Sequence, residues 1–255
     1  MLLAIDIGNS NIVIGGIDEE KIRFEARIAT DRIKTSDQYG VEIKNILSLF
    51  EVPVETVEDV IISSVVPPVF NAVRTGAYKV TGLTPMVVGP GIKTGLNIQM
   101  DNPASVGSDL IVAAVAALQE YTAPLMLIDM GTATTITVVD QGNNYIGGAI
   151  IPGVRVSAEA LSSRAAQLPG IQLDRPKRAI GKNTIECMRS GIMYGAAAML
   201  DGMVERMEAE LGKPVTVVAT GGIAQFIVPL CKREMTIEKD LLLKGLNVIY
   251  KKNKK

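Results

Sequence analysis

The chain has 255 residues, of which 47% are hydrophobic and 21% are charged, so it can form one large domain or two of ordinary size. Its 26 basic and 27 acidic residues give a formal net charge of -1, which argues against nucleic acid or an anionic membrane as a partner. Histidine is absent, which excludes serine–histidine catalysis, cysteine–histidine catalysis and most zinc sites. If the protein is an enzyme, we expect its general base to be a carboxylate.

The sequence pattern predicts a cytoplasmic protein. The apolar run at the N-terminus has no basic segment before it and is interrupted by Asp6, so it resembles neither a signal peptide nor a membrane anchor. No apolar stretch reaches the roughly 18 residues that a spanning helix needs. The two cysteines, Cys187 and Cys231, have no CxxC partner, and we expect reduced, buried thiols.

The sequence pattern in the first half of the chain predicts a meander of strands followed by alternating helices and strands. Short polar turns separate three strand signals, which favours antiparallel pairing, and Ser36 is a candidate cap for the first helix. The predicted elements are strands at 2–7, 11–17 and 21–29, a helix at 36–50, a buried strand at 59–66, a helix from the Pro-Pro at 67–68 to about 80, a short strand with a Gly-rich connector at 86–98, and a helix at about 106–121.

The second half repeats this order. The predicted elements are strands at 125–129, 134–139 and 144–151, helices at about 154–166 and 183–211, a buried strand at 215–220 and a last helix at 239–250. We therefore expect an α/β protein made of two domains of the same topology, residues 1–117 and 118–255. The pattern predicts a helical joining segment, so we expect hinged lobes that face each other across a cleft.

An acidic hairpin motif occurs once in each half. "IDIGNSN" at 5–11 returns as "IDMGTAT" at 128–134, so Asp6 corresponds to Asp129 and Gly8 to Gly131. A tight turn after Asp-x-Gly lets backbone N–H groups approach a phosphate, and the aspartate can hold a cation or an ordered water. An ordinary hairpin explains either copy alone, whereas two copies at matching positions favour a polyphosphate site.

Other nucleotide-binding motifs are incomplete. "GPGIKTG" at 89–95 and "IGKNT" at 180–184 lack the P-loop spacing, and no GxGxxG opens a helix. "TGG" at 220–222 follows a buried strand, where it suits either an adenosine-side element or a tight strand-to-helix turn.

The two hairpins and the late "TGG" resemble the actin, Hsp70 and sugar-kinase superfamily. More narrowly, a series of motifs along nearly the whole chain resembles the type III pantothenate kinases, in order "DIGNSN", "SSVVPP", "VGPGIKTGLNI", "NPASVGSD", "DMGTATT", "GGAIIPG", "SAEALSSRAAQLP", "GKNT", "SGIMYG", "ATGG" and "LLLKGL". The resemblance implies two duplicated actin-like (ribonuclease H-like) domains, mixed β-sheets flanked by helices, and a central nucleotide cleft. It also implies ATP-dependent phosphorylation of pantothenate to 4'-phosphopantothenate, the first step of coenzyme A biosynthesis, by a cytoplasmic homodimer.

The resemblance assigns roles to individual residues. ATP, with magnesium, would be bound by Asp6, Ile7, Gly8, Asn9, Ser10, Asn11, Ile12, Val13 and Thr132, with Asp6 holding magnesium directly or through water. Asp109 would be the general base that takes the proton of the pantothenate hydroxyl. Without the family context, the preferred explanation is an acidic residue that the dipole of a helix N-terminus favours. Asp129 would bind a monovalent cation, potassium or ammonium. Pantothenate would contact Gly107, Ser108, Asp109, Leu110 and Thr184, near the subunit interface.

Two positions depart from the family pattern. Leu110 stands where the family usually has an arginine that could pair with the carboxylate of pantothenate, and Met100 stands where it often has an aromatic residue. Two alternatives therefore stay open: a kinase for another small hydroxyl acceptor, and a nucleotide-binding regulatory relative with weakened catalysis.

Overall fold

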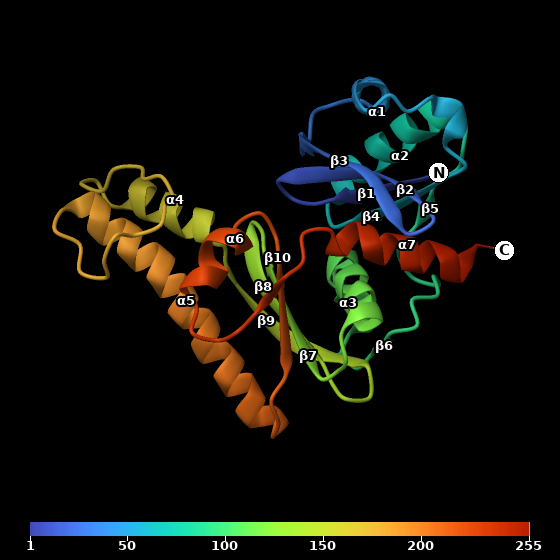
Figure 1. The fold of residues 1–255 in the computed structure, drawn as a ribbon. Helices are drawn as coiled ribbons and strands as arrows, with labels where there is room; N and C mark the ends of the chain where they lie inside the picture. The colour runs from blue at the N-terminus through green and yellow to red at the C-terminus, as the bar shows by residue number, and fades with distance from the viewer. Residues whose placement is uncertain (255) are drawn as a thin grey trace. The chain divides into compact units, whose positions relative to one another are not determined.

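The computed structural model describes residues 1–254, which form two compact units (Figure 1). Unit 1 comprises Met1–Leu96, Asp101–Gln119 and residues 240–254, and unit 2 comprises Asn97–Met100 and Glu120–Lys239. No helix among these residues is both long enough and apolar enough to cross a membrane.

The sheet of unit 1 has the order β3-β2-β1-β4-β5. Its strands are β1 (Leu2–Ile7), β2 (Asn11–Asp18), β3 (Lys21–Ala29), β4 (Asp59–Ser64) and β5 (Met86–Val87). The first three form the predicted antiparallel meander, and β4 pairs in parallel with β1 and then with β5.

Helices cover both faces of this sheet. Helices α1 (Ser36–Leu49) and α2 (Pro67–Thr81) lie on one face, and α3 (Ser108–Glu120) and α7 (Leu241–Asn253) lie on the other (Figure 1). Because side chains alternate along β1, Leu3, Ile5 and Ile7 enter the core under α1 and α2, while Leu2 and Ala4 enter the core under α3 and α7. This two-sided burial explains the continuous apolar run of the first strand.

The last helix belongs to unit 1, whereas the predicted boundary groups all residues from 118 to 255. Leu243, Leu246 and Ile249 of α7 are almost fully buried against the sheet and α3. Helix α7 also meets α3 closely, since a Cβ on Gly245 would lie 2.1 Å from the carbonyl oxygen of Val112. The apolar face of α7 therefore completes a core that the residues before position 118 leave open.

The sheet of unit 2 has the order β11-β10-β7-β8-β9-β6. Its strands are β6 (Asn97–Ile98), β7 (Leu125–Met130), β8 (Ala133–Val139), β9 (Asn144–Pro152), β10 (Thr216–Thr220) and β11 (Thr236–Ile237). The antiparallel β7-β8-β9 meander and the parallel pairing of β10 with β7 repeat the pattern of unit 1. The duplication of topology is therefore present in the structure, with β6 added beside β9.

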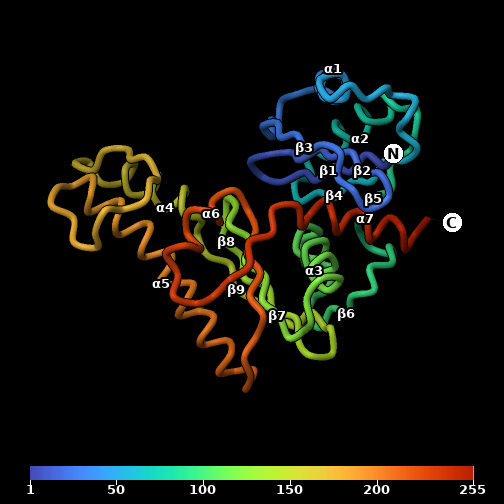
Figure 2. The backbone as a smooth tube through the Cα atoms, viewed as in Figure 1, coloured from blue at the N-terminus to red at the C-terminus, as the bar shows by residue number. Residues whose placement is uncertain are grey.

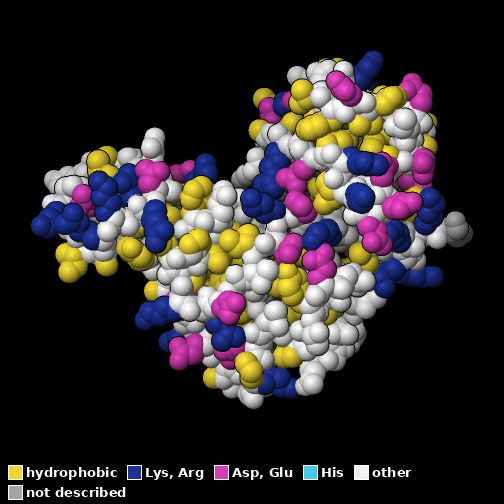
Figure 3. Space-filling model, viewed as in Figure 1, with side chains coloured by type: hydrophobic (Ala, Val, Ile, Leu, Met, Phe, Trp, Pro, Cys, Tyr) yellow, Lys and Arg dark blue, Asp and Glu magenta, His cyan; other side chains and the backbone are white. Residues whose placement is uncertain are grey.

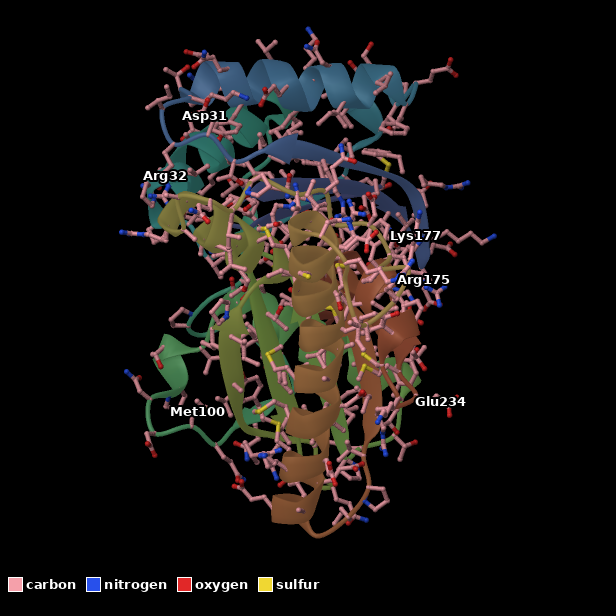
Figure 4. The ribbon with its side chains drawn as sticks, turned by 90° about the vertical axis from the view of Figure 1, so that its left-hand side faces the viewer. Asp31, Arg32, Met100, Arg175, Lys177 and Glu234 are labelled. Atoms are coloured by element: carbon pink, nitrogen blue, oxygen red, sulfur yellow. The ribbon has the colours of Figure 1, made fainter. Side chains whose placement is uncertain are left out.

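The long helix α5 (Thr184–Leu211) packs along one face of this sheet and lies in front of it in Figure 4. The remaining helices of unit 2 are α4 (Val154–Arg164) and the short α6 (Ala224–Ile227), and 3-10 turns lie at Val54–Thr56, Pro103–Ser105 and Val228–Leu230. The connection between α4 and α5 has no regular structure (Figure 2).

Both cysteines are free, and the prediction of buried thiols is wrong for Cys187. Cys187 lies in the first turn of α5 and is exposed, because its neighbours Met188 and Ser190 face the interior instead. Cys231 is half-buried, and burial raises the pKa of its thiol to about 12.

Candidate active site

The first acidic hairpin joins β1 and β2 through Gly8, Asn9 and Ser10. The Gly8 N–H donates to the carbonyl of Asn11 at 3.0 Å, and a Cβ on Gly8 would also lie 3.0 Å from that oxygen, which explains why glycine suits the turn. The side chains of Asn9, Ser10 and Asn11 are exposed.

The apolar residues of the same motif have a different role. The side chains of Ile7 and Ile12 are fully buried in the core of unit 1, and Val13 is half-buried. Any contact that Ile7 or Ile12 makes with a ligand would therefore come from the backbone.

Thr30, just after β3, stabilises this hairpin through two hydrogen bonds. Its hydroxyl donates to the carbonyl of Gly8 at 2.6 Å, and its N–H donates to the carbonyl of Ser10 at 3.0 Å. The role of Thr30 could not be predicted from the sequence, since a lone threonine after a strand belongs to no motif and its partners lie about twenty positions earlier.

Asp6 is nearly buried, with 5% of its surface exposed. Ser63 of β4 lies directly opposite Asp6 in the parallel pairing of β4 with β1, and its hydroxyl donates a hydrogen bond to Oδ1 of Asp6. This contact was not predictable from the sequence either, because only the pairing of β4 with β1 brings the two residues together.

Asp109 lies in the first turn of α3 and is half-buried. The N–H of Leu110 donates to Asp109 Oδ1 at 2.8 Å, and a Cβ on Gly107 would lie only 2.5 Å from the same oxygen. Burial raises the pKa of the Asp109 carboxyl, and this effect exceeds the opposing effect of the backbone N–H donors. The carboxylate of Asp109 is therefore more basic than usual, and Gly107 has no side chain that would clash with it.

Ser108 joins the start of α3 to the end of β4. Its hydroxyl donates to the carbonyl of Ser64 at 3.0 Å and accepts from the N–H of Ser64 at 3.2 Å. Ser63, which contacts Asp6, is the residue before Ser64. The structure thus brings the predicted residues Asp6, Ser108 and Asp109 to the same end of the unit 1 sheet.

The second acidic hairpin lies in unit 2 and is one residue shorter. Gly131 and Thr132 join β7 to β8, and the Gly131 N–H donates to the carbonyl of Ala133 at 3.0 Å. The Gly153 N–H donates to the carbonyl of Thr132 at 3.2 Å, and a Cβ on Gly153 would lie 2.3 Å from that oxygen. Gly153, from the "GGAIIPG" motif, therefore packs directly on the turn.

The "TGG" motif packs against the same hairpin. Gly221 has a positive φ of 95°, and a Cβ there would lie 2.7 Å from Asp129 Oδ1 and 2.6 Å from the carbonyl oxygen of Met130. The motif that suggests an adenosine-side element thus forms one wall beside Asp129.

Asp129 also has a polar neighbour on β8. Thr135 is its direct partner in the antiparallel pairing, so both side chains point to the same face of the sheet. The hydroxyl of Thr135 is buried, and within residues 1–254 it has no hydrogen-bond partner. Such an orphaned oxygen beside a carboxylate suits a bound cation or water.

Thr184 begins α5 and is exposed. The side chain of Asn183 caps the helix by accepting from the N–H of Glu186 at 2.9 Å, and Glu186 accepts from the N–H of Lys182 at 3.0 Å. The Lys182 N–H, followed by the charges of neighbouring basic residues, lowers the pKa of Glu186. The "GKNT" motif is thus a helix start that presents Thr184 to solvent.

The two departures from the family pattern lie in different units. Leu110 is half-buried in unit 1. Met100 is half-buried in unit 2, on the segment that follows β6 (Figure 4), and its sulfur lies 3.8 Å from the place of a Cβ on Gly147.

Among residues 1–254, acidic side chains alone do not form a metal-binding cluster. In the part of the chain that the structure describes, no three Asp, Glu, Cys or His side chains gather to hold an ion. A cation at Asp6 or Asp129 would therefore take most of its ligands from water, backbone or phosphate, as magnesium does in phosphoryl-transfer sites.

Comparison with known proteins identifies the family. The family model for type III pantothenate kinase matches residues 2–206. The chain is 47% identical, over 100% of both chains, to a type III pantothenate kinase of Exiguobacterium sp. (strain ATCC BAA-1283 / AT1b).

Solved structures agree on the fold. A "conserved putative Baf family transcriptional activator" from Campylobacter jejuni has a TM-score of 0.61 at 18% identity and 98% coverage of each chain. A ROK family glucokinase from Streptomyces griseus, in complex with glucose and AMPPNP, has a TM-score of 0.51 at 13% identity and 97% coverage of each chain. These likenesses carry the fold alone and confirm the predicted α/β class with two sheets flanked by helices, as in actin-like kinases. From the family match and the full-length alignment with its relative, we conclude that the chain belongs to the type III pantothenate kinase family.

Proposed function

We propose that this protein transfers the γ-phosphate of ATP to the hydroxyl of pantothenate and forms 4'-phosphopantothenate, the first step of coenzyme A biosynthesis, in the cytoplasm. The observation that carries the proposal is Asp109, a half-buried carboxylate whose pKa burial raises, in the same unit as a hairpin of exposed donors. A base and a phosphate-binding turn are the parts that a kinase without histidine needs.

In this mechanism Asp109 accepts the proton of the pantothenate hydroxyl. The hydroxyl oxygen forms a bond to the γ-phosphorus while the bond between that phosphorus and the bridging oxygen of ADP breaks. The transition state is loose, so the positions of the groups and the neutralisation of charge matter more than the strength of the base.

The hairpin at 6–13 would hold the ATP phosphates through backbone N–H groups and the exposed side chains of Asn9, Ser10 and Asn11. Asp6 would hold magnesium or its water shell, which neutralises the phosphate charge. Thr132 in the second turn is exposed and would contact ATP.

We assign a monovalent cation, potassium or ammonium, to Asp129. The orphaned hydroxyl of Thr135 supports this assignment, because a neutral oxygen beside a single carboxylate suits a large ion of low charge.

We also propose a homodimer. Unit 2 exposes large apolar side chains at β9, the α4–α5 connection and the start of α5, with Ile150 78%, Ile180 83% and Ile185 45% exposed. A second copy that covers them would remove this apolar surface from water and enclose Thr184 beside Ile185. Arg175 and Lys177 lie on the same connection (Figure 4), and Figure 3 shows several basic side chains over this part of unit 2, where they would attract the pantothenate carboxylate.

Leu110 favours a second candidate, phosphoryl transfer to another small hydroxyl compound that lacks a carboxylate. A leucine cannot form the charge-assisted hydrogen bond that an arginine offers.

The test is an incubation of the purified protein with ATP, magnesium and potassium, with and without pantothenate. We expect a pantothenate-dependent product that is heavier by one phosphoryl group in mass spectrometry. ATP binding without any phosphorylated pantothenate contradicts the assignment, and transfer to a carboxylate-free analogue alone favours the second candidate.

A further inference from the structure

We propose that the end of β4, Ser63–Ser64, positions both carboxylates of the active site: Ser63 orients Asp6 toward magnesium, and the backbone of Ser64 holds the turn that carries Asp109. The inference rests on the proposed function, and it makes Ser63 and Ser108 positioning residues.

The first contact is the hydrogen bond from Ser63 to Asp6. Ser63 is 0% exposed and Asp6 is 5% exposed, so neither group can rely on bulk water. A carboxylate rotates easily about its Cβ–Cγ bond, because that torsion has no sharp minima. A hydroxyl that donates to Oδ1 fixes the plane of the carboxylate, as partners behind metal ligands do in other sites.

The second contact is the reciprocal pair of hydrogen bonds between Ser108 and Ser64. The Ser108 hydroxyl lies 3.0 Å from the carbonyl oxygen and 3.2 Å from the nitrogen of Ser64. Because one hydroxyl bonds to both backbone groups, the pair fixes the position of Ser108 relative to β4. Asp109 follows Ser108 directly. A Cβ on Gly107 would lie 3.4 Å from Val65 Cγ1, so the turn also packs against the residue after Ser64.

The two contacts lie on consecutive residues of one strand, which is parallel to β1 and hydrogen-bonded to it. Asp6 and Asp109 therefore take their positions from the same rigid element rather than from two loops. A kinase gains from this arrangement, because a displacement of the base relative to the phosphates by about 1 Å can reduce the rate by about 10²-fold.

The inference separates the effects of two variants. Ser63→Ala should weaken magnesium binding in the ATP complex, and loss of such a supporting partner reduces metal affinity by about 10–100-fold. Ser108→Ala should leave magnesium affinity unchanged and reduce kcat, since it displaces Asp109 alone. Ser108→Thr retains the hydroxyl and should recover most of the rate.

The experiment measures binding of Mn²⁺ to the ATP complex by water-proton relaxation, and kcat and KM with pantothenate. Thr81→Ala is the matched control, because it removes another hydroxyl of unit 1 that donates to a backbone carbonyl, that of Ala77 at 2.8 Å, outside the site. If Ser63→Ala does not fold, Ser63→Cys, with a weaker donor of similar size, takes its place.

Weaker Mn²⁺ binding in the Ser63 variant but not in the Thr81 control supports the inference. Equal Mn²⁺ affinity in the Ser63 variant and wild type overturns it, and so does a Ser108→Ala variant with wild-type kcat. The Mn²⁺ measurement needs no pantothenate, so a failure of the proposed acceptor leaves it interpretable.

Discussion

Asp109 combines burial with the role of general base that we propose for it, and the two make opposite demands on its charge. Burial favours the protonated form, so the folded-state pKa lies above that of the unfolded chain. Folding therefore binds protons at this site, and the stability contribution falls as pH rises from the unfolded pKa through the raised one.

We expect Asp109→Asn to reduce phosphoryl transfer by about 10²–10⁴-fold while ATP still binds. The variant should also unfold at a higher temperature than wild type at neutral pH, because the amide carries no charge to desolvate. The advantage in melting temperature should shrink in acid, where the wild-type carboxyl is protonated. Kinetics, ATP titration and melting curves across pH test this, and near-normal turnover contradicts the role of Asp109.

Leu110 lacks the positive charge of the arginine that the family usually has at this position. We expect Leu110→Arg to lower KM for pantothenate by one to two decades, since a charge-assisted hydrogen bond contributes about 1.5–3 kcal/mol and about 1.4 kcal/mol is tenfold. KM for ATP should stay the same, because the hairpin at 6–13 is intact. Steady-state kinetics with each substrate varied in turn provide the measurement, and an unchanged or raised KM for pantothenate means that another group holds the carboxylate.

At the scale of elements, the second hairpin is a copy of the first with a different environment. Gly153 and Gly221 pack on it so closely that neither has room for a Cβ, whereas the first hairpin is braced by a threonine side chain. We interpret the difference as specialisation of the second hairpin for the monovalent cation.

Replacement of potassium by sodium or lithium should therefore reduce the rate sharply, through the site at Asp129 and Thr135. The measurement compares initial rates in the three chloride salts at matched ionic strength, with Asp129→Asn as the variant that should lose the preference. Equal wild-type rates in all three salts would remove the cation from the mechanism.

Local sequence patterns predicted most helices and strands. The features that they did not predict depend on contacts between residues far apart in the chain. The strands at 2–7 and 125–129 were predictable because each is an apolar run that ends at Asp-x-Gly. Ser63 was not, because its meaning depends on the parallel register that places it opposite Asp6. The exposure of Cys187 depends on which face of α5 packs inward, which residue type alone does not determine.

At the scale of the whole molecule, packing of α7 completes the hydrophobic core of unit 1. We expect Gly245→Ala to destabilise the protein, because the new Cβ would lie 2.1 Å from the carbonyl oxygen of Val112 in α3 and one helix must move. Overpacking of this kind costs about 1–3 kcal/mol. Denaturant unfolding measures the loss, and Gly191→Ala in α5, where no atom lies within 4 Å of the added Cβ, is the control that should not lose stability.

The return of α7 to the first unit has a consequence for the order of events on the ribosome. Every residue of unit 2 emerges before residue 240, whereas unit 1 lacks its closing helix until those last residues appear. Domains usually fold in the order of their synthesis. Here unit 2 can complete its folding while Leu2, Ala4 and Val112 of unit 1 are not yet buried by α7. We expect the nascent chain to expose that apolar face to chaperones until α7 has emerged.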